Sequence, residues 1–126
     1  MAIETLSAIT LFTHDMERAL AFYQALGFRK VWAQRDNAFV VINAGAAWVN
    51  LQLVPPEQTW GWWGRFIFHV DDVDAHYDRA VAAGYHPEAA PSDAPWGERY
   101  FQVLDPDGHE VSIAKRLRPA SAPRPV

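Results

Sequence analysis

The 126-residue sequence contains no cysteine, which excludes a disulfide framework and a metal site with thiolate ligands. It also has no apolar run near the roughly 20 residues that a membrane-spanning helix requires. Lysine and arginine number 11 against 15 acidic residues, and they form no cluster that would neutralise nucleic-acid phosphates. We therefore expect a cytoplasmic protein with neither a nucleic-acid nor a membrane partner.

Hydrophobic residues make up 50% of the sequence and charged residues 21%, which is the composition of a globular domain with one compact core. Tryptophan is frequent, since six residues in this short chain are Trp. An indole ring has a large apolar area and one polar edge. These rings either pack in the core or line a ligand cavity, and the sequence leaves both interpretations open.

One pattern occurs twice in the chain. An alternating strand segment precedes Asp15, which begins a helical pattern that stops at Gly27. The same order returns 57 residues later, where another strand segment precedes a helical pattern from Asp72 to Gly84. In both copies the N-cap aspartate and the terminating glycine are twelve residues apart. This spacing predicts a duplicated strand–helix unit.

Further alternating segments after each helical pattern predict more strands. They lie at 29–34, 38–42 and 48–54 in the first copy, and at 87–90 (a weak segment), 100–104 and 110–114 in the second. Each copy thus predicts the order βαβββ, which gives an α+β fold with one face of each sheet buried under its helix. Two such sheets side by side would enclose a cavity.

The duplication also predicts the domain boundaries. The predicted parts are a first βαβββ unit at 1–57, a Trp- and Gly-rich linker at 58–64, a second unit at 65–117 and a disordered, proline-rich tail at 118–126. The linker contains Trp60, Trp62 and Trp63. These rings either fold over the mouth of the cavity or pack at a subunit interface.

Two motifs give the chain a family resemblance. The first runs from Asp15-Met16-Glu17-Arg18-Ala19 through Phe22-Tyr23 to Leu26-Gly27-Phe28, and the second from Pro95-Trp96-Gly97-Glu98-Arg99 through Tyr100 to Gly108. With the duplication, they make the chain similar to the vicinal oxygen chelate superfamily, which includes glyoxalase I, extradiol dioxygenases and bleomycin-resistance proteins. The resemblance implies a homodimer with its active site on the concave face of a curved sheet. In the family's enzymes, four side chains there hold one divalent metal that acts as a Lewis acid.

The positions that the resemblance assigns to the metal hold other residue types here. They are Ala8, Asn50 or Gln52, Arg65, and Ser112. Alanine supplies no donor atom, and a guanidinium is a permanent cation that repels a metal ion. We therefore expect no metal and no cofactor. The alternative is a relocated metal site that uses His69, on the same strand face as Arg65.

Arg65 and His69 each have two interpretations. A strand-borne arginine that points into a cavity needs a partner, so Arg65 meets either an internal carboxylate such as Glu110 or an anionic group of a ligand. His69 is either a general base or acid beside Arg65, or a structural residue that bonds the adjoining loop. Tyr100 is the other candidate for proton transfer. The histidines expected at solvent-exposed positions are His14, His76 and His109.

Alternation along the strands assigns one set of side chains to the cavity wall. Aromatic rings with a few hydrogen-bonding groups are typical of a small-molecule site, unless the rings fill the space themselves. The predicted ligand-binding residues are Ala8, Thr10, Phe12, Trp32, Phe39, Trp48, Asn50, Gln52, Arg65, Ile67, His69, Tyr100, Gln102 and Ser112.

Two classes of function fit these residues. The first is a metal-independent protein that sequesters an aromatic or oxygenated small molecule, as the resemblance to bleomycin-resistance proteins implies, with antibiotic resistance as its role. The second is a metal-free isomerase, cyclase or lyase, in which Arg65 stabilises charge while His69 or Tyr100 transfers a proton. A metal-dependent lyase or dioxygenase is the third hypothesis.

Overall fold

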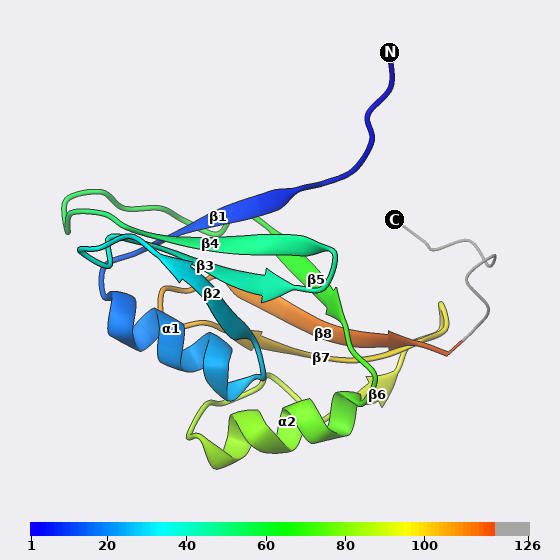
Figure 1. Cartoon of the computed structure of the whole chain (residues 1–126). Helices are drawn as coiled ribbons and strands as arrows, with labels where there is room; N and C mark the ends of the chain where they lie inside the picture. The colour runs from blue at the N-terminus through cyan, green and yellow to red at the C-terminus, as the bar shows by residue number, and fades with distance from the viewer. Residues whose placement is uncertain (118–126) are drawn as a thin grey trace. The chain divides into compact units, whose positions relative to one another are not determined.

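The computed structural model describes residues 1–117 of the chain (Figure 1). The predicted tail at 118–126 lies outside the described residues. Contacts within the chain divide it into two units, of which the first ends at Gly61 and the second begins at Trp62. This boundary falls inside the predicted linker 58–64.

The first unit has one helix and a four-stranded sheet. Its elements are β1 (Ala8–Thr13), α1 (Met16–Ala25), β2 (Arg29–Ala33), β3 (Phe39–Ala44) and β4 (Ala47–Leu53). The strands lie in the order β1-β4-β3-β2, with β1 parallel to β4 and the other neighbours antiparallel.

The second unit repeats this topology. Its elements are β5 (Arg65–His69), α2 (Val73–Ala82), β6 (Ser92–Asp93), β7 (Glu98–Leu104) and β8 (Glu110–Arg116). The strand order is β5-β8-β7-β6, and β5 again runs parallel to the last strand of its unit, β8. The α+β fold of two βαβββ units, predicted from the spacing, is thereby confirmed.

The helix ends follow the predicted residues. The side chains of Asp15 and Asp72 each accept a hydrogen bond from the backbone N–H three residues ahead, at 3.1 and 3.0 Å, as N-caps do. Both helices end before a glycine with positive φ, 100° at Gly27 and 92° at Gly84. Residues with a side chain rarely adopt this backbone conformation, so glycine suits the position.

The predicted weak strand at 87–90 is wrong. The short strand of this region is β6, which pairs Ser92 and Asp93 with β7. In the predicted segment, only the N–H of Glu88 bonds a β7 carbonyl, that of Gln102 at 2.9 Å. Proline has no N–H to donate, and Pro87 stands within the predicted segment, which weakens its ability to pair as a strand.

The side chains on the helix-facing side of each sheet form its core. The largest of these side chains are Leu11, Ile42 and Leu51 with Phe22 and Tyr23 of α1 in the first unit, and Phe101, Val111 and Ile113 in the second. Tyr77 of α2 contacts Phe101 edge-on, with 5.5 Å between the ring centroids, which places the helix on that face of the second sheet. The other face of each sheet, called the open face below, carries the intervening side chains.

Candidate functional site

The predicted ligand-binding residues of the first unit all lie on its open face. Residues directly opposite each other in paired strands point to the same side of a sheet. The register forms three rows on this face: Ala8 with Trp48; Thr10 with Asn50, Val41 and Trp32; and Phe12 with Gln52 and Phe39. The sequence therefore placed these side chains correctly, and their binding role stays a prediction.

The open face of the first unit combines exposed rings with amides. Trp32 is 55% exposed and Trp48 39% exposed. Asn50 donates a hydrogen bond from Nδ2 to Thr10 Oγ1 at 3.2 Å. Trp60 extends the surface, because its ring meets Phe12 edge-on at a centroid distance of 6.2 Å. A flat molecule would find both a stacking surface and hydrogen-bonding groups here.

The open face of the second unit has the same organisation in rows. The register aligns Arg65 with Glu110 and Leu104, Ile67 with Ser112 and Gln102, and His69 with Ala114 and Tyr100. All the predicted ligand-binding residues of this unit are therefore on one face. Ser112, in the central strand, is buried, whereas Ile67 on the edge strand is 42% exposed.

Arg65 is paired within the protein. Its Nε donates to Oε2 of Glu110, the residue directly opposite it in the ladder. The arginine side chain is 47% exposed and that of Glu110 16% exposed. Of the two predicted partners for Arg65, the structure shows the internal carboxylate, so this guanidinium is neither deeply buried nor uncompensated.

His69 meets a carboxylate that the sequence analysis did not single out. Its Nε2 lies 2.8 Å from Oε2 of Glu98, a residue only 4% exposed. The indole Nε1 of Trp96 donates to the other oxygen of Glu98 at 3.0 Å. The Trp96 ring in turn stacks on Tyr100, with 6.1 Å between centroids and 27° between planes. Alternation along the strand places Glu98 on the same face as Tyr100, two residues away. This alternation could have identified Glu98 from the sequence.

The expectation that His69 lies beside Arg65 is wrong. The two residues begin and end β5, four residues apart, so at the rise of a strand their Cα atoms are separated by about 13 Å. They share a face but cannot both contact one small reacting group. A mechanism that joins Arg65 and His69 at a single atom is not supported by this geometry.

The residues at the family's metal positions do not fit a divalent cation. Ala8 supplies no donor atom on the first face, and Arg65 places a permanent positive charge on the second face. A metal needs several oxygen, nitrogen or thiolate donors converging on one point. Within residues 1–117, no group of three or more His, Asp or Glu side chains converges in that way, around His69 or elsewhere.

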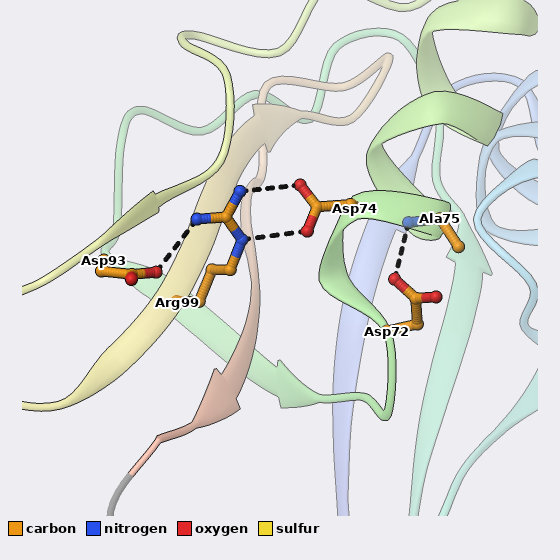
Figure 2. A network of polar contacts seen from close by, with 5 residues as sticks. All are labelled: Asp72, Asp74, Ala75, Asp93 and Arg99. Atoms are coloured by element: carbon orange, nitrogen blue, oxygen red, sulfur yellow. Dashed lines mark hydrogen bonds and ion pairs between the residues drawn. The ribbon is translucent and has the colours of Figure 1, made fainter.

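The other face of β7 holds a charged network with a structural role. Arg99 donates two hydrogen bonds to Asp74 at the start of α2, at 2.8 and 2.9 Å, and a third to Asp93 of β6 at 3.0 Å (Figure 2). Hydrogen bonding from Arg99, more than charge attraction, lowers the pKa of Asp74. The same bonds, that to Asp74 first, raise the pKa of Arg99. This network ties helix to sheet.

The tryptophans are not core residues. Five of the rings are exposed, and Trp60 is half-buried. Trp63 stacks on Phe66 at a centroid distance of 6.0 Å, and its Nε1 donates to Nδ1 of His109 at 2.7 Å. His109 is 4% exposed, so the expectation that it faces solvent is wrong. Trp62 is 68% exposed, and its role as a lid or interface residue stays a prediction.

Comparison with known proteins identifies the family. The model of the Glyoxalase/Bleomycin resistance protein/Dioxygenase superfamily matches residues 5–113. The chain belongs to this family. It is 33% identical over 108 residues to the putative glyoxylase CFP32 of Mycobacterium bovis, a match that covers 83% of this chain and 41% of CFP32. The chain thus spans less than half the length of the curated relatives that it matches.

Solved structures of family members share the fold. TioX from Micromonospora sp. ML1 is 26% identical with a TM-score of 0.74, and the match covers 90% of this chain and 100% of TioX. A bleomycin resistance determinant encoded on the transposon Tn5 is 20% identical with a TM-score of 0.72, over 90% of this chain and 98% of that one. At that identity the likeness concerns the fold alone. No helix within residues 1–117 is long and apolar enough to cross a membrane.

Proposed function

We propose that this member of the glyoxalase/bleomycin-resistance family is a cytoplasmic homodimer that binds an aromatic or oxygenated small molecule without a metal. By sequestering the molecule it would confer resistance to an antibiotic of that class. The observation that carries the proposal is the exposure of aromatic rings among hydrogen-bonding side chains on the open faces, where Trp48 stands beside Asn50 along β4.

The chemistry of the open faces favours binding over metal-dependent catalysis. An exposed indole loses contact with water when a flat ring stacks on it, which supplies affinity, and the neighbouring amides fix the orientation. The charge at the family's metal position is a guanidinium that Glu110 already neutralises. A ligand therefore needs no metal to compensate charge on this face.

The test is a thermal-shift screen of planar aromatic antibiotics against the full chain, followed by calorimetry on each hit. We expect a hit to bind the wild-type protein about tenfold more tightly than Trp48→Ala, because truncation removes a stacking surface worth about 1.4 kcal/mol. Val81→Ala is the matched control, since Val81 is an exposed apolar residue of α2, the helix that covers the opposite face of the second sheet. Hits that bind Trp48→Ala as tightly as wild type would contradict the proposed face.

A metal-free enzyme is the second candidate, and the contact between His69 and Glu98 is the observation that favours it. A histidine held by a carboxylate is an arrangement that moves protons in catalysis. Incubation of a bound ligand with catalytic amounts of protein distinguishes the two functions, because only an enzyme releases a changed molecule.

A further inference from the structure

The contacts of Glu98 fix which nitrogen of His69 is available. When Glu98 is ionised, its carboxylate only accepts hydrogen bonds, so Nε2 of His69 carries the proton and donates a hydrogen bond to Glu98. The indole of Trp96 also only donates, and it occupies the other carboxylate oxygen. In neutral His69, Nδ1 then holds a lone pair and is a hydrogen-bond acceptor. Within residues 1–117 this nitrogen has no hydrogen-bond partner.

The surroundings of His69 suit a proton arriving at Nδ1. The His69 side chain is 41% exposed, so a ligand reaches it, whereas the side chain of Glu98 is 5% exposed. A protonated imidazole would form a charge-assisted hydrogen bond with Glu98, about twice as strong as a neutral one. Among residues 1–117, Arg116 lies directly opposite Glu98 in the β7–β8 ladder and so on the same face.

The same cluster offers a flat apolar surface. Trp96 is 39% exposed and stacks on Tyr100, while its indole nitrogen is bonded to the carboxylate that holds His69. Glu98 therefore holds both an aromatic surface, the ring of Trp96, and a hydrogen-bond acceptor, Nδ1 of His69. A ligand that uses both features is planar and carries an acidic hydroxyl group.

We propose that His69, Trp96, Glu98 and Tyr100 form a binding site for planar phenols and enols, whose hydroxyl group gives its proton to Nδ1 of His69. The O–H bond breaks, an N–H bond forms at Nδ1, and the electron pair stays on the ligand oxygen as a phenolate or enolate. Glu98 compensates the imidazolium, and no co-reactant is needed. The inference rests on the proposed binding function and names the class of ligand for the second open face.

The experiment uses 4-nitrophenol as the probe and 4-nitroanisole, its methyl ether without an acidic proton, as the matched ligand. We expect the wild-type chain to bind 4-nitrophenol at least about tenfold more tightly than 4-nitroanisole, as one charge-assisted hydrogen bond provides. We also expect bound 4-nitrophenol to show the absorption band of the phenolate at a pH where the free probe is largely protonated.

Two variants remove the acceptor in different ways. His69→Gln deletes the imidazole at an exposed position. Glu98→Gln introduces an amide that can donate to Nε2, which turns Nδ1 from an acceptor into a donor. Both variants should bind the two probes equally and lose the phenolate band. His76→Gln, at a histidine on α2 whose Nδ1 lies 2.9 Å from the carbonyl oxygen of Asp72 at the start of that helix, should behave as wild type. Circular dichroism checks that each variant is folded.

The outcomes separate this inference from the proposed function. If the wild-type chain binds both probes equally, Nδ1 of His69 does not accept a proton from the ligand. Binding of planar molecules would still be supported. If His69→Gln keeps the preference for 4-nitrophenol, another group takes the proton and the inference is overturned. If neither probe binds, the site is wrong, and the proposed function is then judged by the antibiotic screen with Trp48→Ala on the first face.

Discussion

At the scale of single residues, the contact between Trp63 and His109 has a defined hydrogen-bond direction. An indole only donates, so Nδ1 of His109 accepts, and the buried imidazole holds its proton on Nε2 when neutral. The backbone N–H of His109 is bonded separately to Asp105 Oδ1 at 2.9 Å. Substitution of the imidazole should therefore release the indole without breaking the turn.

We expect His109→Leu to lower the free energy of unfolding by about 1 kcal/mol, the usual net contribution of one hydrogen bond. Urea unfolding of His109→Leu, Trp63→Phe and the double variant measures the coupling between the two side chains. His109→Gln, which keeps an acceptor, should recover part of the loss. Additive effects in the double variant would show that the bond contributes no stability.

At the scale of elements, Arg99 joins three of them, since it lies on β7 and its partners belong to α2 and β6. Two parallel hydrogen bonds from one guanidinium to one carboxylate, as with Asp74, form the strongest geometry for such a pair. Because Asp74 and Asp93 are exposed, water screens the pair, and we expect a modest contribution to stability.

The lowered pKa of Asp74 gives this contact a pH dependence of known sign. A carboxyl whose pKa is lower in the folded than in the unfolded state stabilises the fold above its ordinary value of 3.8, and that contribution is lost as the pH falls through the folded value. The wild-type chain should therefore lose more stability between pH 7 and about pH 3 than Arg99→Met does. Urea midpoints at the two pH values measure this.

Arg79→Met is the control for that comparison. Arg79 is an exposed arginine of α2. Its replacement should leave the acid-induced loss as large as in the wild type. An equal acid-induced loss in Arg99→Met would mean that the network carries no pH-dependent stability.

At the scale of the whole molecule, the duplicated unit supplies two open faces, and their residues no longer suit the family's metal. We expect zinc or manganese ions to leave the melting temperature of the dialysed protein unchanged, because an ion raises it only by binding the folded state. Differential scanning fluorimetry with increasing metal concentration is the measurement. A rise that depends on metal concentration would contradict our assignment of these positions.

A variant provides the positive control for the metal experiment. Arg65→His combined with Ser112→Glu returns ligand-type side chains to two of the family's metal positions. These positions are diagonal neighbours on β5 and β8, because Arg65 pairs with Glu110 and Ser112 pairs with Ile67. This double variant should respond to zinc more strongly than the wild type.

The sequence by itself determined the duplicated unit, its helix ends and the faces of its strands. A capping aspartate, a glycine at positive φ and a two-residue alternation act within a few residues, so Asp15, Gly27 and the shared face of Thr10 and Phe12 were predictable. The short strand β6 was misplaced because only pairing with β7 defines it.

Only the tertiary structure decided which donor meets which acceptor. Glu98 lies 29 residues from His69 in sequence, and Arg65 lies 45 residues from Glu110. The strand order β5-β8-β7 and its register bring these side chains together. No local pattern encodes such a meeting, because it depends on how strands distant in sequence pair. The sequence identified His69 as a candidate, and the pairing of the strands in the folded sheet placed the carboxylate of Glu98 beside it.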